Sequence, residues 1–117
     1  MAASASMAGV TRLCDVKGDR KDSFDVEVHV LPGSASYTTG TNRSGVKWRK
    51  LKFDVEDDTA KMQLLAWNDD ADYFRSRIFP DNAYRLCGVK AAIYDGVTQV
   101  HLKNGSTREL VSGKEVR

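Results

Sequence analysis

The sequence predicts an all-β fold: a barrel of five strands with one short helix between the third and the fourth strand. Three observations lead to this prediction. Five segments alternate apolar and polar residues with the period of two that is typical of a half-buried strand. The segment from Ala71 to Ile78 instead carries apolar residues at helical spacing. The length of 117 residues fits one domain with a single small core.

The first expected strand covers residues 24–31 and is stopped by Pro32 and Gly33. Its apolar and polar residues alternate strictly, so one face should be buried, and that face comprises Phe24, Val26, Val28 and Val30. Turn-forming residues then dominate residues 32–46, and no period is visible there. We therefore expect residues 32–46 to form a long flexible loop, a kind of segment that is often functional.

The second and third expected strands, residues 48–55 and 61–67, should form a hairpin through an acidic turn. Their core side is expected to comprise Leu51, Phe53, Val55, Met62, Leu64 and Ala66. Trp67 falls by parity on the opposite side, which it shares with Gln63 and Leu65. Tryptophan is usually a mostly buried residue, but on this side it would offer an exposed ring.

Asn68 is expected to begin the short helix, because a polar side chain can accept hydrogen bonds from the unpaired amides there. The fourth strand is expected at residues 83–93, with Gly88 as a bulge or bend. The fifth strand follows at residues 97–103, after a hairpin turn signal at residues 94–96. The expected organisation is a disordered start at 1–9, a folded domain at 10–111 and a flexible tail at 112–117.

Composition narrows the class of protein. Hydrophobic residues make up 41% and charged residues 29%, which argues against a disordered or fibrous chain. No stretch approaches the roughly 20 apolar residues of a membrane span, and no signal-peptide pattern begins the chain, so the cell interior is the expected compartment. Two cysteines without a Cys-x-x-Cys or Cys/His cluster predict free thiols and no zinc site.

The order of strands and helix is the one expected of an oligonucleotide/oligosaccharide-binding (OB) barrel. A closer resemblance rests on three segments. Residues 50–68, 70–74 and 84–90 resemble the hairpin, the following helix and the fourth strand of the DNA-binding domains of the replication protein A large subunit. Meiosis-specific and telomere-end OB proteins contain related modules. The resemblance runs from residue 26 to about residue 108 and implies a module that binds single-stranded DNA.

The resemblance also implies which aromatic rings would stack on bases. In the family one ring lies at the end of the third strand, a position that Trp67 holds here. A second ring typically lies on the fifth strand, where this chain has Gln99. Tyr94 or Tyr37 is therefore a candidate for the second ring. Trp48 is a further candidate, because its parity opposes the core face of its strand.

Charge is polarised along the chain, although the net charge is only +2. Residues 43–52 contain five basic residues and no acid, whereas acids dominate residues 54–72. A basic run is often a solvated face or a protected edge strand. This run lies on the long loop and the second strand, which flank the binding groove in OB folds. We favour contact with phosphates, through Arg43, Lys47, Arg49, Lys50 and Lys90.

The candidate nucleic-acid contacts combine these rings and basic residues with the polar side chains of the fifth strand. His101 shares a strand face with Gln99, although a surface histidine is the simpler interpretation. The complete set is Trp67, Trp48, Arg43, Lys47, Arg49, Lys50, Tyr37, Lys90, Gln99 and His101.

No catalytic or metal site is expected. The aspartate pairs at 57–58 and 69–70 fall in a turn and at a helix start, positions that favour aspartate for backbone reasons. The order of residues offers no Ser/His/Asp or Cys/His pairing and no glycine loop for phosphates. The sequence therefore indicates a non-enzymatic protein without a cofactor.

The leading hypothesis is a nuclear, non-catalytic module that binds single-stranded DNA with weak sequence preference in DNA replication, recombination, repair or telomere maintenance. One alternative is an OB fold that binds a protein partner within a complex like replication protein A, which the missing second ring favours. Another is a binder of single-stranded RNA. One OB fold covers only about 4–16 nucleotides, so other OB-fold subunits or domains are plausible partners.

Overall fold

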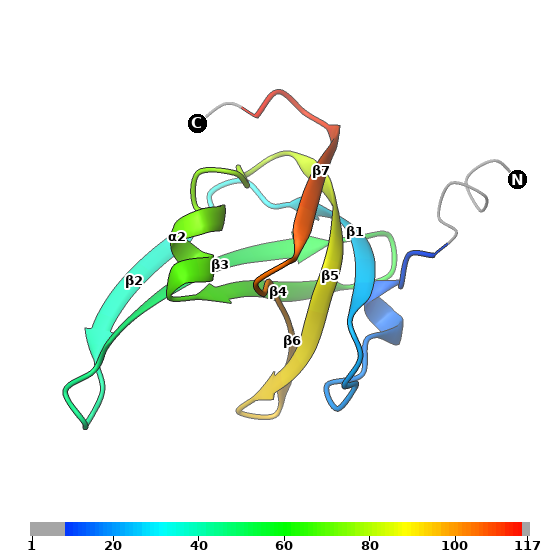
Figure 1. Cartoon of the computed structure of the whole chain (residues 1–117). Helices are drawn as coiled ribbons and strands as arrows, with labels where there is room; N and C mark the ends of the chain where they lie inside the picture. Colours follow the sequence, from blue (N-terminus) through cyan, green and yellow to red (C-terminus); the bar gives the residue numbers. More distant parts are fainter. Residues whose placement is uncertain (1–8, 116–117) are drawn as a thin grey trace, which may run out of the picture.

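Five strands close into a barrel in the computed structural model, which describes residues 9–115. They are β1 (Phe24–Val30), β3 (Lys47–Glu56), β4 (Lys61–Trp67), β5 (Ala83–Tyr94) and β6 (Val97–His101). Around the ring the order is β1, β3, β4, β6, β5, and pairing of β1 with β5 closes it (Figure 1). The neighbours β4 and β6 run parallel, and the other pairs of the ring run antiparallel. The predicted five-stranded OB-type barrel is confirmed.

The barrel forms because each strand buries every second side chain. In β1 the buried positions alternate with half-buried ones along the whole strand. In β3 the residues Leu51, Phe53 and Val55 are at most 4% exposed, as their parity predicts. Tyr84 and Phe53 are the largest fully buried side chains of the interior. The alternation read from the sequence is therefore the alternation of the core.

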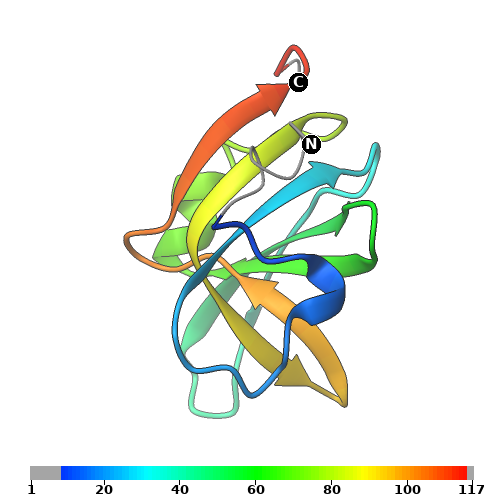
Figure 2. The same cartoon turned by 90° about the vertical axis from the view of Figure 1, so that its right-hand side faces the viewer.

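A 3-10 turn, η1 (Leu13–Asp15), packs against the barrel through Leu13. Leu13 is buried, and its amide donates a hydrogen bond to Asp57 in the β3–β4 turn. The same carboxylate accepts from the amides of Thr59 and Ala60, which fixes the turn itself. Figure 2 shows η1 beside the barrel strands, seen from the side.

Two glycine positions bend the sheet as the sequence predicts. Gly88 has φ +73° and lies where the pairing of β1 with β5 shifts register, so it forms the expected bulge. Asp95 and Gly96, with φ of 53° and 78°, make the two-residue turn between β5 and β6. Two positive φ values are what a tight turn of this hand requires.

Helix α2 (Asp69–Phe74) lies between β4 and β5 and buries Ala71 and Phe74, as predicted. Its start differs from the prediction, because the Asn68 side chain makes no capping hydrogen bond. Asn68 has φ 56°, and its Oδ1 instead accepts from the backbone amide of Arg49 at 3.0 Å. The left-handed backbone turns the side chain across to β3, so Asn68 fixes the strand instead of the helix.

Strand β2 (Ser36–Thr41) corrects the expectation of a long flexible loop at residues 32–46. β2 pairs antiparallel with the first half of β3, from Ser36 opposite Lys52 to Thr41 opposite Lys47. Tyrosine and three threonines supply strand propensity there, while the turn formers gather on either side. Since β3 extends beyond the barrel, this strand has an open edge to pair with. We call β2, residues 42–46 and residues 47–52 the arm; it projects from the barrel in Figure 1.

Strand β7 (Thr107–Ser112) pairs with the first half of β5, from Ala83 to Cys87. The sequence predicted no strand at residues 107–112, only a polar continuation of the chain. The side chains of β7 are almost all exposed, so it lacks the burial alternation that reveals a strand. The predicted start at 1–9 falls mostly outside the described residues, and the boundary at residue 111 stays a prediction. Among the described residues no helix is long and apolar enough to cross a membrane.

Candidate nucleic-acid interface

Four adjacent strands, β3, β4, β6 and β5, form one continuous outer face of the barrel. Directly opposed residues on neighbouring strands share a face, so the pairing defines rows of side chains. One row crosses the sheet through Lys52, Leu65, His101 and Lys90. The next row crosses it through Asp54, Gln63, Gln99 and Ala92, and a third pairs Lys50 with Trp67. The core residues of β3 and β4 alternate with these and point inward, so the rows form an external floor.

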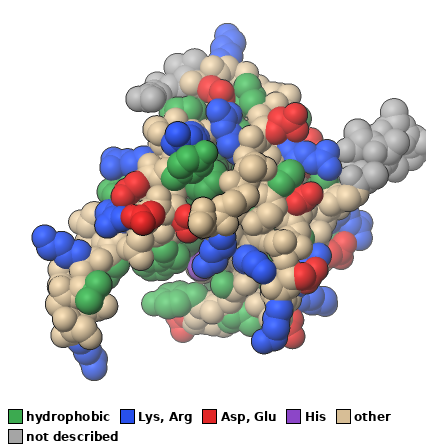
Figure 3. All heavy atoms as spheres, in the orientation of Figure 1, with side chains coloured by type: hydrophobic (Ala, Val, Ile, Leu, Met, Phe, Trp, Pro, Cys, Tyr) green, Lys and Arg blue, Asp and Glu red, His purple; other side chains and the backbone are tan. Residues whose placement is uncertain are grey.

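A groove of about 510 Å³ lies over this floor. The β5–β6 hairpin contributes its tip, and β3 and β4 contribute the other side. The lining comprises Lys50, Lys52, Gln63, Leu65, Trp67, Ala92, Ile93, Tyr94, Asp95, Val97, Gln99 and His101. Figure 3 shows Lys and Arg side chains on the projecting arm and beside the hollow between the arm and the body.

Trp67 and Trp48 form an aromatic pair at the arm side of the groove. Their ring centroids are 6.0 Å apart, with an edge-to-face angle of 67°. The Lys50 Nζ atom lies 5.8 Å from the Trp67 ring. Trp48 also lies across Gly40 on β2: a Cβ atom there would meet the indole at 2.3 Å. Both rings are half-buried, so each keeps some surface for a ligand while its orientation is fixed.

Gln99, at the position where the resemblance implies a second ring, is a buried floor residue with 5% exposure. Its Nε2 donates to Gln63 Oε1 at 2.8 Å, and its Oε1 lies 3.2 Å from His101 Nε2. Burial lowers the pKa of His101, and the charge of Lys103 lowers it further. At neutral pH these three side chains of the floor therefore form an uncharged hydrogen-bonded chain.

Arg49 and Tyr37 lie on the other face of the arm, against helix α2. The Arg49 guanidinium pairs with Asp69 and with Asp72, at 2.9 Å in both cases. The Tyr37 hydroxyl donates to Asp72 at 2.7 Å, which raises its pKa. The Arg75 guanidinium covers the Tyr37 ring at 3.8 Å. The structure therefore does not bring these two predicted site residues into the groove.

The remaining basic candidates, Lys90, Arg43 and Lys47, do not belong to the lining of the groove. Lys90 occupies the row of His101, but its Nζ donates to the Lys21 carbonyl at 2.9 Å. Arg43 is exposed at the tip of the arm, and Lys47 is exposed near it. Of the predicted set, the groove lining contains Trp67, Lys50, Gln99 and His101, and Trp48 contacts Trp67.

Sequence reasoning did not select Lys52, Gln63 or Leu65 as site residues, although all three line the groove. The parity that exposes Lys50 and Trp67 also places these three on the outer face. Strand parity was thus a sufficient signal for them. Tyr94 was a candidate for the second ring, and it lies at the hairpin tip with 72% exposure.

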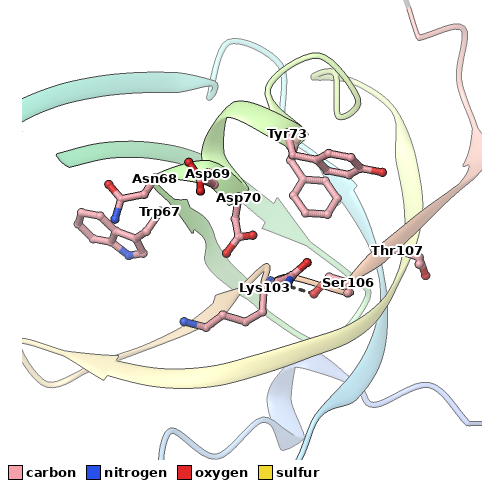
Figure 4. Close-up of a pocket in the computed structure, with 11 residues that line it drawn as sticks. Trp67, Asn68, Asp69, Asp70, Tyr73, Lys103, Ser106 and Thr107 are labelled. Atoms are coloured by element: carbon pink, nitrogen blue, oxygen red, sulfur yellow. Dashed lines mark hydrogen bonds between the residues drawn. The ribbon is translucent and has the colours of Figure 1, made fainter. Parts of the chain in front are cut away.

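Trp67 also borders a second hollow of about 820 Å³, between helix α2 and residues 103–107. Figure 4 shows Trp67 at one end of this hollow and Thr107 at the other. Asp69 and Asp70 belong to its lining, with Lys103 opposite them. The carboxylates would repel phosphates, so the groove on the opposite side of Trp67 suits a polyanion better. Within residues 9–115 no cluster of His, Cys, Asp and Glu could hold a metal ion.

Solved structures share this architecture. A structure of a replication protein A heterotrimer bound to ssDNA contains a chain that matches 89% of this protein, with a TM-score of 0.73 and 10% identity. The OB domain of Ta0387 from Thermoplasma acidophilum matches 90% of this protein and 89% of its own chain, with a TM-score of 0.68 and 14% identity. The fold is an OB barrel. The second OB-fold domain of replication protein A from Methanococcus maripaludis also has it, with a TM-score of 0.64 and 10% identity over 89% of this chain and 96% of that one.

The predicted resemblance of this OB barrel to replication protein A is confirmed at the level of the fold. The chain spans about a quarter of the heterotrimer chain that it matches. No model of a protein family and no curated protein matches the sequence. The comparisons therefore identify the fold by its shape alone. The side chains of the groove indicate which ligand it can bind.

Proposed function

We propose that this OB barrel is a non-catalytic module that binds single-stranded DNA across the groove. The observation that supports it best is the half-buried Trp67 ring at the groove, with Trp48 against it and Lys50 beside it. An aromatic ring next to a cation suits a nucleotide, since the ring can stack on a base while the cation contacts a phosphate. Stacking contributes about 1–3 kcal/mol per base and tolerates every base.

The charges favour the same surface. Within the described residues no ion pair engages Lys50 or Lys52, and both line the groove. Arg43 and Lys47 extend the positive charge along the exposed arm. Phosphate contacts of this kind depend on released counterions, so the affinity should fall steeply with salt. We propose Trp67, Trp48, Lys50, Lys52, Arg43 and Lys47 as the principal contacts.

We also propose a biological setting for this module. The chain resembles domains of replication protein A in shape, which supports a role in DNA replication, recombination, repair or telomere maintenance. In a eukaryotic cell that role implies the nucleus. One OB fold binds only about 4–16 nucleotides, so we propose that the module acts beside other OB-fold domains or subunits.

A second candidate function is binding of a protein partner through the β5–β6 hairpin. Ile93, Tyr94 and Val97 are 58%, 72% and 52% exposed at its tip. Neighbouring apolar side chains on an exposed tip are a feature of interaction surfaces. Gln99 also removes one ring from the groove. Single-stranded RNA is a further possible ligand, and competition between matched RNA and DNA oligonucleotides distinguishes it.

The deciding experiment titrates a fluorescent oligo-dT of about 20 nucleotides with the protein, by anisotropy at low and moderate salt. Trp67→Ala is the test variant, and Tyr73→Ala is its control, because Tyr73 is an exposed ring outside the groove. We expect wild type and Tyr73→Ala to bind alike, and Trp67→Ala to bind about 10- to 100-fold more weakly. Absence of binding to wild type at low salt would overturn the proposal in favour of a protein partner.

A further inference from the structure

Gly40 lies in the interior of strand β2, although its backbone does not require a glycine. Its φ is not one of the positive values that favour glycine. Glycine inside a strand also costs conformational entropy and leaves no side chain to pack. The residue directly opposite on β3 is Trp48, and side chains at such opposed positions normally contact each other. The reason for the glycine therefore lies in what covers it.

The Trp48 indole covers Gly40. A Cβ atom on residue 40 would lie 2.3 Å from Cζ2 and 2.6 Å from Cε2 of the ring, which is closer than such atoms approach. The ring thus occupies the space of the missing side chain, as aromatic residues do when they compensate for a glycine on a neighbouring strand. Because an indole can rotate about its side-chain bonds, a methyl group on residue 40 would displace Trp48 and leave the paired backbone in place.

Trp48 in this position supports the ring of Trp67. The two indoles meet edge to face, with centroids 6.0 Å apart. Trp67 belongs to the lining of the groove and Trp48 does not, so Trp48 contacts the stacking ring from outside the groove. A ring whose orientation is fixed before binding loses less freedom when a base stacks on it. The contact joins three strands, because Gly40 lies on β2, Trp48 on β3 and Trp67 on β4.

We propose that Gly40 is a positioning residue for DNA binding: it leaves the space in which Trp48 packs, and Trp48 holds the Trp67 ring in the orientation that stacks on a base. This inference rests on the proposed binding of single-stranded DNA in the groove. It gives the arm a second role besides its positive charge. Strand β2 lies off the closed ring of the barrel, yet it orients a ring that belongs to a barrel strand.

The test is a double-mutant cycle on residues 40 and 48, with affinity for the labelled oligo-dT measured by anisotropy. The proteins are wild type, Gly40→Ala, Trp48→Leu and the double variant. Thr39→Ala is the control, because Thr39 is exposed on the same strand and points to the opposite face. Affinities are measured where urea unfolding shows each variant to be folded, so that a loss of stability cannot imitate weaker binding.

We expect Gly40→Ala to bind about 2- to 10-fold more weakly, which is the effect of losing one aromatic pair, and Thr39→Ala to bind like wild type. In the Trp48→Leu background, Gly40→Ala should cause no further loss, because the ring that it displaces is already absent. An equal loss in both backgrounds would mean that Gly40 acts through the arm itself, and would overturn the inference. Wild-type affinity in Gly40→Ala would overturn it as well. In both cases the proposed function stands.

Circular dichroism observes the ring pair directly. The chain has only two tryptophans, and both belong to the pair, so coupling between indole transitions reports on this pair alone. The paired positive and negative bands of coupled indoles should be present in wild type and in Thr39→Ala, and be lost in Gly40→Ala. Unchanged bands in Gly40→Ala would overturn the inference, whatever the affinity. If wild type does not bind oligo-dT at all, the proposed function itself fails, a result distinct from any difference between variants.

Discussion

The two faces of β3 carry similar basic residues in different surroundings. Lys50 and Lys52 point into the groove beside Trp67, and no ion pair engages them in the described part of the chain. Arg49, immediately before Lys50 in sequence, points to the other side and pairs with Asp69 and Asp72 of helix α2. Successive residues of a strand point to opposite faces, so neighbouring basic side chains have different surroundings. Arg49 holds helix α2, whereas Lys50 and Lys52 face the groove.

A basic run in a strand is not one electrostatic unit, because its side chains point to two different faces. Successive residues of a strand face opposite ways, so Arg49 cannot serve the same ligand as Lys50 and Lys52. The acidic start of α2 neutralises Arg49, and these ion pairs also attach the base of the arm to the barrel. Lys50 and Lys52 give the groove its positive charge, although the net charge of the chain is only +2.

The largest effect is expected from removing the groove-facing pair. Lys50→Gln with Lys52→Gln should reduce the slope of log affinity for oligo-dT against log salt by about 1.4, because each phosphate contact on a single strand contributes about 0.7. That corresponds to roughly a twenty-fold loss of affinity at 0.1 M salt. Anisotropy titrations at four salt concentrations measure it. The matched control is Lys17→Gln with Lys61→Gln, two exposed lysines outside the groove, which should keep the wild-type slope.

A smaller effect, and on stability instead of binding, is expected from Arg49→Gln. The variant breaks the two ion pairs that Arg49 of β3 forms with α2, and the Arg49 side chain is 32% exposed. The free energy of unfolding in urea should fall by at most about 1 kcal/mol at low salt, and by less at 1 M salt. The salt slope of oligo-dT binding should remain that of wild type. A slope reduced by about 0.7 would instead place Arg49 on a phosphate.

The smallest effect is expected on the pH dependence of stability, through His101 in the floor of the groove. The pKa of His101 is lowered in the folded protein, by burial first and by Lys103 second. The folded state therefore binds this proton less readily than the unfolded state, whose histidine titrates near pH 6.5. The stability that His101 contributes should be present above about pH 6.5 and be lost as the pH falls below it.

Urea unfolding between pH 7.5 and pH 5.5 measures this loss, and comparison with His101→Gln isolates it from other titrating groups. The decline in the free energy of unfolding should be steeper for wild type than for the variant. Parallel curves would mean that His101 is as well solvated in the folded barrel as in the unfolded chain.

Local patterns predicted much of the fold and part of the site. Alternation placed Phe53 in the core and Trp67 outside it, because a strand has only two faces. The dipeptide Asp95-Gly96 predicted its turn, because few residues adopt two successive positive φ values. The same alternation would have added Lys52 and Gln63 to the site, had it been applied to the groove face as strictly as to the core.

Other features depended on contacts between distant residues. β2 is a strand because β3 extends beyond the barrel and offers an edge, and residues 32–46 carry no period that shows this. Tyr37 was a plausible stacking ring until the fold placed Asp72 and Arg75 against it. Gln99 reads in the sequence only as a missing ring, whereas in the barrel it joins Gln63 to His101.

The sequence by itself determined which side chains share a face, where the chain turns and how many strands the barrel has, since these follow from neighbours a few residues apart. The tertiary structure alone decided which strands pair, which basic side chains form ion pairs and which polar side chains are hydrogen-bonded to one another across the floor of the groove. Those outcomes require parts of the chain 20 or more residues apart to pack together, as Arg49 does with Asp69 and Gln63 with Gln99, and no local pattern in the sequence records such contacts.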